Sequence, residues 1–388
     1  MSAGYKALAR KDFDAAQASF SAAAKLDTNS PQPLLALAEV ERRRANRAEA
    51  ERWLRRALDV APGSADVQRA WGRYQFSVRS YVLAESALRK AAELDPASPA
   101  TQYDLADLYL NWLQRPADAA AAYRRLIKMR PEDAGAHFGL GVALASQRQS
   151  RDAASEFEQA AVLAPQNPLP LTALGRLYAL SDEPQKALAA FDRALNVKAD
   201  YAPALVERGD LYLKRSEYAR AAADFEQVVK LAPKDAMNVF KLGSAYQLSG
   251  KLGLAEQQYR RSIELDPKFA PALNNLAAMS AERRQNLDVA LDWAKRAVAV
   301  DPNMGELQDT LGSVYLARGE SNPAIAAYRK ATTLAPKNAE FYYGLGEALA
   351  QKGDKQEAIA AFKKALSVNP SFARSAEAQK RIAALGGH

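Results

Sequence analysis

Residues 339–370 read AEFYYGLGEALAQKGDKQEAIAAFKKALSVNP, and this stretch decides the fold. Apolar residues recur at helical spacing over residues 339–351, and Lys352-Gly353-Asp354 forms a turn signal. A second helical pattern covers residues 355–368, and Asn369-Pro370 ends it because proline cannot continue a helix. The stretch therefore predicts two helices joined by a short turn.

The same pattern recurs along the whole chain at a spacing of 34 or 35 residues, which identifies a repeat protein. The closing position holds Thr28, Pro62, Pro96, Pro131, Pro165, Ala199, Pro233, Pro267, Pro302, Pro336 and Pro370. Eleven repeats result. Two of them carry one extra residue, near Arg115-Pro116 and Gln285-Asn286. We expect both insertions in the turn between the two helices, where they would disturb no packing.

Twelve residues before each closing position stands an alanine, a small side chain suited to a close helix crossing. Four residues after it comes a large apolar residue: Phe20, Leu54, Leu88, Tyr123, Phe157, Phe191, Phe225, Tyr259, Tyr328 and Phe362. The ninth repeat instead has Ala294 beside Trp293. The first helix of each repeat holds glycine or alanine at one fixed position. Because glycine costs a helix about 1 kcal/mol relative to alanine, its recurrence indicates a close backbone approach.

These features resemble the tetratricopeptide repeat. The resemblance implies an all-α, right-handed superhelical α-solenoid whose concave groove is lined by the first helix of each repeat. We expect one solenoid over residues 1–388: a truncated first repeat (1–29), repeats two to eleven (30–371) and a C-terminal capping helix (372–385). Because terminal repeats need a polar cap, the truncated start predicts a segment of a longer protein or a poorly ordered first helix.

The resemblance also assigns positions 2, 5, 9 and 12 of each repeat to the groove. The expected partner-binding residues are Arg42, Arg69, Arg73, Tyr103, Asp107, Phe138, Val142, Thr172, Arg176, Val206, Asp210, Met237, Phe240, Glu306, Asp309, Glu340, Tyr343 and Glu347. Their chemistry changes from basic through apolar to acidic along the chain. Exposed aromatic residues in a groove indicate a peptide site. Alternatively, Phe138 and Phe240 cover neighbouring helices.

The sequence lacks the residues that two known ligand-binding modes of the family require. A carboxylate clamp would need lysine and asparagine where Arg69 and Arg73 stand, and an asparagine ladder would need more than Asn275.

Composition excludes several classes of function. The 388 residues are 48% hydrophobic, carry a net charge of +8 and contain no cysteine, which excludes disulfides and thiolate zinc sites. No apolar run is long enough for a membrane span, and the first residues do not resemble a signal peptide. Of the two histidines, His388 ends the chain and His137 falls at a packing position. No metal-binding or phosphate-binding motif occurs, so we expect no enzyme, no cofactor and no metal.

The sequence therefore predicts a protein–protein interaction scaffold that binds a peptide or a partner protein. The chain resembles the alanine- and arginine-rich, cysteine-free repeat arrays of bacterial cell-envelope, secretion or exopolysaccharide assemblies, which implies such a setting. The lack of cysteine slightly favours the periplasm over the cytoplasm. The alternatives are a self-assembling scaffold and a weak nucleic-acid or polyanion binder that uses the N-terminal arginines. Specific nucleic-acid recognition is not expected, because the groove positions vary too much to supply a regular code.

Overall fold

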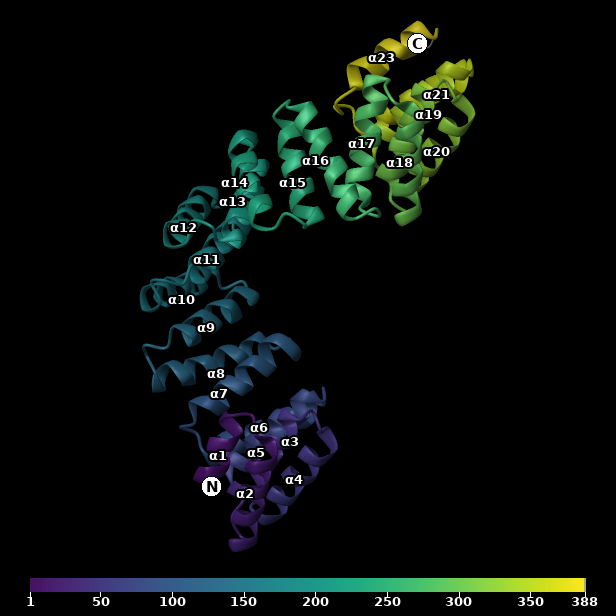
Figure 1. Ribbon diagram of the computed structural model, residues 1–388. Coiled ribbons are helices and arrows are strands. Elements are labelled where there is room, and N and C mark those ends of the chain that lie inside the picture. Colours follow the sequence, from purple (N-terminus) through teal and green to yellow (C-terminus); the bar gives the residue numbers. More distant parts are fainter. Residues whose placement is uncertain (387–388) are drawn as a thin grey trace. The chain divides into compact units, whose positions relative to one another are not determined.

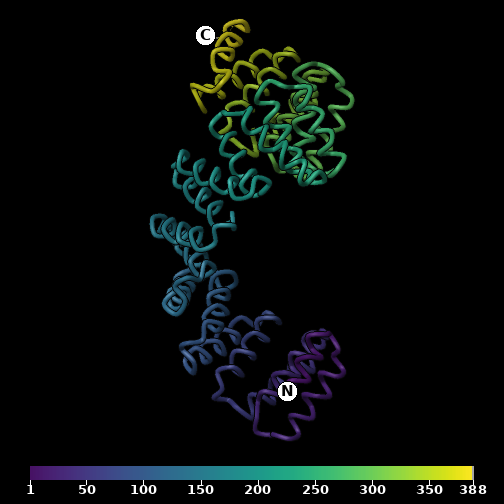
Figure 2. Tube along the Cα trace, turned by 60° about the vertical axis from the view of Figure 1, so that its left-hand side comes forward, coloured from purple at the N-terminus to yellow at the C-terminus, as the bar shows by residue number. Residues whose placement is uncertain are grey.

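The structure is a computed structural model that describes residues 1–386, and within them it is built from helices and turns alone. Consecutive helices form antiparallel hairpins, which follow one another along the chain (Figures 1 and 2). There are eleven such hairpins in the described residues, from α1–α2 to α21–α22, and a final helix follows them. The number and the register of the predicted repeats are thereby confirmed.

The chain divides into two compact units, Met1–Ala199 and Asp200–His388. The first unit holds α1 (Ser2–Ala9), α2 (Phe13–Leu26), α3 (Gln32–Arg43), α4 (Arg47–Val60), α5 (Ala65–Ser77), α6 (Tyr81–Leu94), α7 (Pro99–Asp107), the π-helix η1 (Leu108–Trp112), α8 (Pro116–Met129), α9 (Ala134–Ser146), α10 (Ser150–Leu163), α11 (Leu169–Leu180) and α12 (Pro184–Val197).

The second unit continues the same alternation of helices. It holds α13 (Ala202–Lys214), α14 (Tyr218–Leu231), α15 (Ala236–Leu248), α16 (Leu252–Leu265), α17 (Ala270–Arg283), α18 (Leu287–Val300), α19 (Gly305–Ala317), α20 (Ser321–Leu334), α21 (Ala339–Lys352), α22 (Lys355–Val368) and α23 (Ser375–Ala384). The last helix lies where a capping helix was expected, and its Ala378 and Ile382 are buried.

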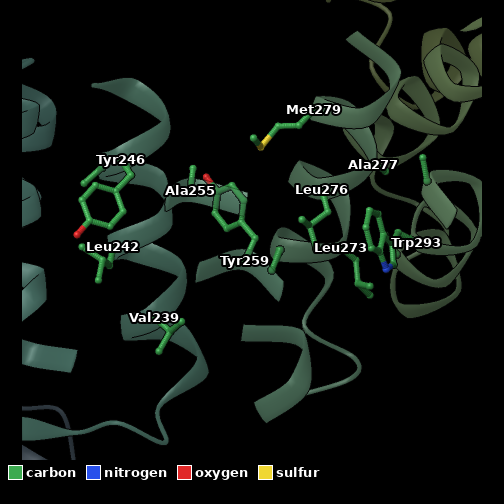
Figure 3. Close-up of a cluster of buried hydrophobic side chains, with 14 of the residues drawn as sticks. Val239, Leu242, Tyr246, Ala255, Tyr259, Leu273, Leu276, Ala277, Met279 and Trp293 are labelled. Carbon is green, nitrogen blue, oxygen red and sulfur yellow. The ribbon is translucent and has the colours of Figure 1, made fainter. Parts of the chain in front are cut away.

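In most hairpins a ring of the second helix lies against the backbone of the first. A Cβ atom added to Gly141 would lie 2.6 Å from the ring of Phe157, and one added to Gly175 would lie 2.5 Å from the ring of Phe191. In the second unit, Tyr259 of α16 lies between the side chains of α15 and those of α17 (Figure 3). The close approach predicted from the recurring small residues is confirmed.

The turn inside each hairpin uses a left-handed residue. Ala45, for example, has φ +60°, and the next amide, of Asn46, donates to the carbonyl of Glu41 at 2.9 Å. This is the Schellman arrangement that ends many helices. Glycine serves at the equivalent place in only three repeats, as Gly250, Gly319 and Gly353. The other repeats use residues with a Cβ atom, for which a left-handed conformation costs about 1 kcal/mol.

The two extra residues are accommodated differently. In the ninth repeat the extra residue lies after the left-handed Arg284, in a turn that contains a second left-handed residue, Asn286, as predicted. In the fourth repeat the prediction of an insertion near Arg115-Pro116 is wrong. The extra residue lies at the end of the first helix, where η1 is wound with a wider turn and the amide of Leu113 donates to the carbonyl of Leu108. A π-turn adds one residue and still keeps the backbone hydrogen-bonded.

Replacing Gly141 by alanine is expected to lower the free energy of unfolding by about 1–3 kcal/mol, because the new Cβ atom would overlap the buried ring of Phe157. Gly253 of α16 has no atom within 4 Å of its added Cβ, so Gly253→Ala should raise stability by about 0.5–1 kcal/mol through helix propensity. Urea unfolding followed by circular dichroism measures both. Equal effects of the two substitutions would contradict the proposed role of the close approach.

Replacing Ala45 by glycine should stabilise the first unit by about 0.5–1 kcal/mol, because glycine adopts the left-handed conformation without the Cβ penalty. The same change at Ala22, an exposed position inside α2, is expected to destabilise it by about 1 kcal/mol. Thermal unfolding of both variants would reveal the opposite signs, and a loss of stability in Ala45→Gly would refute this account of the turn.

Candidate functional site

The first unit contains a cavity of about 470 Å³ between the first helices of three consecutive repeats. Helices α3, α5 and α7 form its walls, and α4 and α6 contribute its floor. It is lined by Leu35, Ala38, Glu39, Arg42, Ala50, Leu54, Ala70, Arg73, Tyr74, Phe76, Ser77, Leu88, Asp104 and Asp107. Of the residues predicted from the sequence to bind a partner, Arg42, Arg73 and Asp107 meet here.

The cavity exists because two adjacent repeats lack an aromatic ring. Leu54 and Leu88 occupy the position that holds phenylalanine or tyrosine in eight other repeats. Both leucines are buried and contact the cavity, and Leu88 lies against Gly72 as Phe157 lies against Gly141. A leucine is shorter than an aromatic ring, so part of the space that the ring would fill stays open. The sequence carries this signal as leucine at a position that is aromatic in eight other repeats.

Carboxylates and guanidinium groups form two clusters at the rim. Glu39 accepts hydrogen bonds from Arg42, at 2.6 and 2.7 Å, and from Arg43, at 2.8 Å. Burial acts to raise the pKa of Glu39, but the hydrogen bonds from the two arginines outweigh it and hold the pKa below its usual value. Glu39 is therefore an ionised carboxylate shared by two cations.

The second cluster joins neighbouring repeats. Arg69 of α5 donates to Asp104 of α7 at 2.6 Å, while Arg73 lies 4.0 Å from the other oxygen of the same carboxylate. The side chain of Arg73 is 60% exposed. The N-terminal arginines expected to form a basic surface are thus paired with acids that the sequence-based assignment left out.

The predicted aromatic residues contribute to packing as well as to the surface. Phe138 lies 5.7 Å from Phe157, and Phe240 lies 5.5 Å from Tyr259, measured between ring centres. Both are partly buried. The hydroxyl of Tyr103 donates to Asp133, which itself caps α9. These rings cover their neighbours, as the alternative interpretation proposed, and they keep part of their surface open.

Two other predicted residues are buried. Thr172 is only 2% exposed and donates its hydroxyl hydrogen to the carbonyl of Pro168, at 2.9 Å. Tyr343 is 7% exposed and packs on Phe362. The guanidinium of Arg374 lies over its ring, 4.3 Å from the ring centre. Burial removes both side chains from any surface open to a partner, so they serve the core.

The acidic positions of the second unit are largely neutralised. Glu340 accepts from Arg374 at 2.7 Å, and Glu347 accepts from Arg381 at 2.6 Å, so the last segment of the chain supplies the cations. Asp309 behaves differently: burial raises its pKa to about 6, with Arg374 acting against the rise and Glu340 and Glu306 adding to it.

The other predicted residues fall into two groups by exposure. Arg176, Met237 and Glu306 are exposed, whereas Val142, Val206 and Asp210 are partly buried, and Asp210 pairs with Lys241.

His137 is buried, with Nδ1 2.6 Å from Glu156 and Nε2 2.9 Å from the carbonyl of Pro131, so it is the packed core histidine that the sequence predicted. Residues 1–386 contain no cluster of side chains suited to holding a metal ion. None of the helices described is both long and apolar enough to cross a membrane.

The succession of hairpins and the cavity between their first helices define an α-helical repeat protein. The chain belongs to the tetratricopeptide repeat family, whose motifs match residues 7–72, 103–168, 172–236, 206–268, 240–304 and 310–381. A search of curated protein sequences finds no match to this chain.

Similar solved structures include the APC/C hetero-tetramer Cut9-Hcn1, with 13% identity and a TM-score of 0.50 over 98% of this chain and 95% of that one. Another is a tetratricopeptide repeat protein from Parabacteroides merdae, with 22% identity and a TM-score of 0.51 over 64% of this chain and 98% of that one. At these identities the likeness shows the fold alone.

Replacing Asp309 by asparagine is expected to stabilise the second unit at neutral pH. The folded-state pKa of about 6 lies above the ordinary value of 3.8, so the folded state holds its proton more tightly and loses stability as pH rises from about 4 to 6. The gain should be about 1–2 kcal/mol above pH 6 and should vanish below about pH 4, where aspartate is protonated in both states.

Melting temperatures of Asp309→Asn and of the unaltered chain between pH 4 and 8 measure this difference. Glu264→Gln, at an exposed position of α16, serves as the control and should show no such pH-dependent gain. A stability difference for Asp309→Asn that is the same at every pH would contradict the assignment of the raised pKa.

Proposed function

We propose that the chain is a non-enzymatic scaffold that binds a peptide or a partner protein on the surface of its first helices. The cavity between α3, α5 and α7 is the principal contact. Families of this kind generally mediate protein–protein interactions. The observation that carries the proposal is an apolar floor, at Leu54 and Leu88, that the fold leaves unfilled inside a charged rim. Such a combination of an apolar pocket and a few placed polar groups is typical of recognition sites.

The two alternatives receive less support from the side-chain contacts. A polyanion binder would need arginines free to meet phosphates, yet Arg42 and Arg69 are held by Glu39 and Asp104. Self-assembly of basic on acidic ends would need charged surfaces at both ends, yet Glu340 and Glu347 are paired within their own unit. Binding through the cavity needs neither.

A narrower hypothesis concerns the cellular setting, a bacterial cell-envelope, secretion or exopolysaccharide assembly. It rests on the alanine-rich and arginine-rich composition and on the lack of cysteine. Fractionation of cells that express the natural gene, with detection of the chain in envelope or cytoplasmic fractions, tests it.

The proposed function is tested by selecting peptides of about twelve residues from a random display library against the full chain and mapping the bound ones by hydrogen exchange. We expect protection in α3, α5 and α7, and a loss of binding of about tenfold in Arg73→Glu. Arg124→Glu, an exposed arginine of α8 outside the cavity lining, is the charge-matched control and should bind normally. Protection confined to other surfaces, or a library that yields no binder, would refute the proposed function.

A further inference from the structure

The cavity has a shape and a charge that favour one class of occupant. We infer that it receives a peptide segment that presents a large apolar side chain, aromatic or leucine-like, directly beside an acidic side chain. This inference rests on the proposed function and specifies the partner of the same site.

The apolar half of the inference follows from what the cavity lacks. In eight repeats an aromatic ring of the second helix fills the space against the first helix, but Leu54 and Leu88 leave it partly open in two adjacent repeats. Leu35 and Phe76 complete an apolar lining, and the volume is about 470 Å³. A partner's ring entering this space would make the contacts that the chain makes for itself elsewhere. The gain comes from burying apolar surface in a preformed site.

The acidic half follows from the balance of charge at the rim. Each of the two carboxylates, Glu39 and Asp104, is shared by two arginines, so each cluster keeps one positive charge. The lining itself holds Arg42 and Arg73 with three carboxylates, Glu39, Asp104 and Asp107. Arg43 and Arg69, just outside the lining, bring the group to four cations and three carboxylates. Arg73 has the weakest contact, 4.0 Å from Asp104, and most of its side chain is exposed. A carboxylate from a partner would give Arg73 a charge-assisted hydrogen bond, whereas a lysine there would be repelled.

The apolar surface continues beyond the cavity. Phe76 lines it on one side and meets Trp112 edge-on, with ring centres 5.5 Å apart, and Trp112 also stacks on Tyr81 at 5.2 Å. Trp112 is 48% exposed and is carried by η1, the π-helix that absorbs the extra residue of the fourth repeat. Val82 and Leu83 beside Tyr81 are exposed too. An extended segment anchored in the cavity would therefore meet a second apolar contact at Trp112.

Three fluorescein-labelled peptides in the same Gly-Ser background test the inference, with the central sequences Glu-Phe-Glu, Lys-Phe-Lys and Glu-Ala-Glu. Fluorescence anisotropy with the full chain gives each Kd. We expect Glu-Phe-Glu to bind about tenfold more tightly than either of the others, because only it supplies both the ring and the carboxylate. Equal affinity for all three, or a preference for Lys-Phe-Lys, would overturn the inference.

Two variants locate the binding. Leu88→Phe should fill the cavity and weaken Glu-Phe-Glu about tenfold; it should fold normally, because Gly72 offers a ring the same approach that Gly141 offers Phe157. Arg73→Glu should weaken Glu-Phe-Glu and strengthen Lys-Phe-Lys, a reversal that misfolding would not produce. Arg124→Glu is again the control. Unchanged binding in Leu88→Phe would overturn the inference.

The outcomes separate this inference from the proposed function. Library peptides that protect α3, α5 and α7 but lack an apolar residue beside an acidic one would overturn the choice of occupant and leave the proposed function intact. A labelled single-stranded oligonucleotide that binds, is lost in Arg73→Glu and is indifferent to Leu88→Phe would also overturn it, in favour of a polyanion. Protection away from these helices would overturn both.

Discussion

In most repeats a ring of the second helix lies against the backbone of the first helix, and this contact is the constraint from which the hairpin follows. A Cβ atom at Gly141, Gly175 or Gly346 would lie within about 2.6 Å of a buried ring, so the two helices can approach only where the side chain is absent. The ring also reaches the next repeat, as Tyr259 does between α15 and α17 (Figure 3). One residue thereby closes its own hairpin and joins it to its neighbour, which is how a solenoid forms a continuous core from small units.

The cavity lies where leucine replaces the ring of this contact in two adjacent repeats. Leu54 and Leu88 keep the hairpins together but do not fill the space, and the first helices provide a lined cavity. Several charged residues of first helices pair with residues of the following repeat or of the last segment. Arg69 reaches Asp104, Arg374 reaches Glu340 and Arg381 reaches Glu347, each 34 or 35 positions along the chain. Such pairs neutralise charges that form a gradient in the sequence, and they leave Arg73 as the cavity-lining arginine with the longest contact to a carboxylate, 4.0 Å from Asp104.

The fold accommodates its two one-residue insertions in different ways, which depend on the local backbone. The ninth repeat places the extra residue in its turn, where Arg284 and Asn286 are both left-handed, whereas the fourth repeat winds the extra residue into η1. The helical solution also carries Trp112 to an exposed position beside the cavity.

By itself, the sequence determined the hairpins, their number, their register and the packing role of His137, because these depend on contacts that repeat at a fixed spacing within about 34 residues. It also pointed to Arg42, Arg73 and Asp107, which the cavity brings together. The tertiary structure alone decided that Thr172 and Tyr343 are buried, that Arg69 is paired and that η1 holds the extra residue. Those outcomes depend on which side chain of the neighbouring repeat lies against each residue. The 34-residue period is the same in all repeats, so it does not predict how these contacts differ from one repeat to the next.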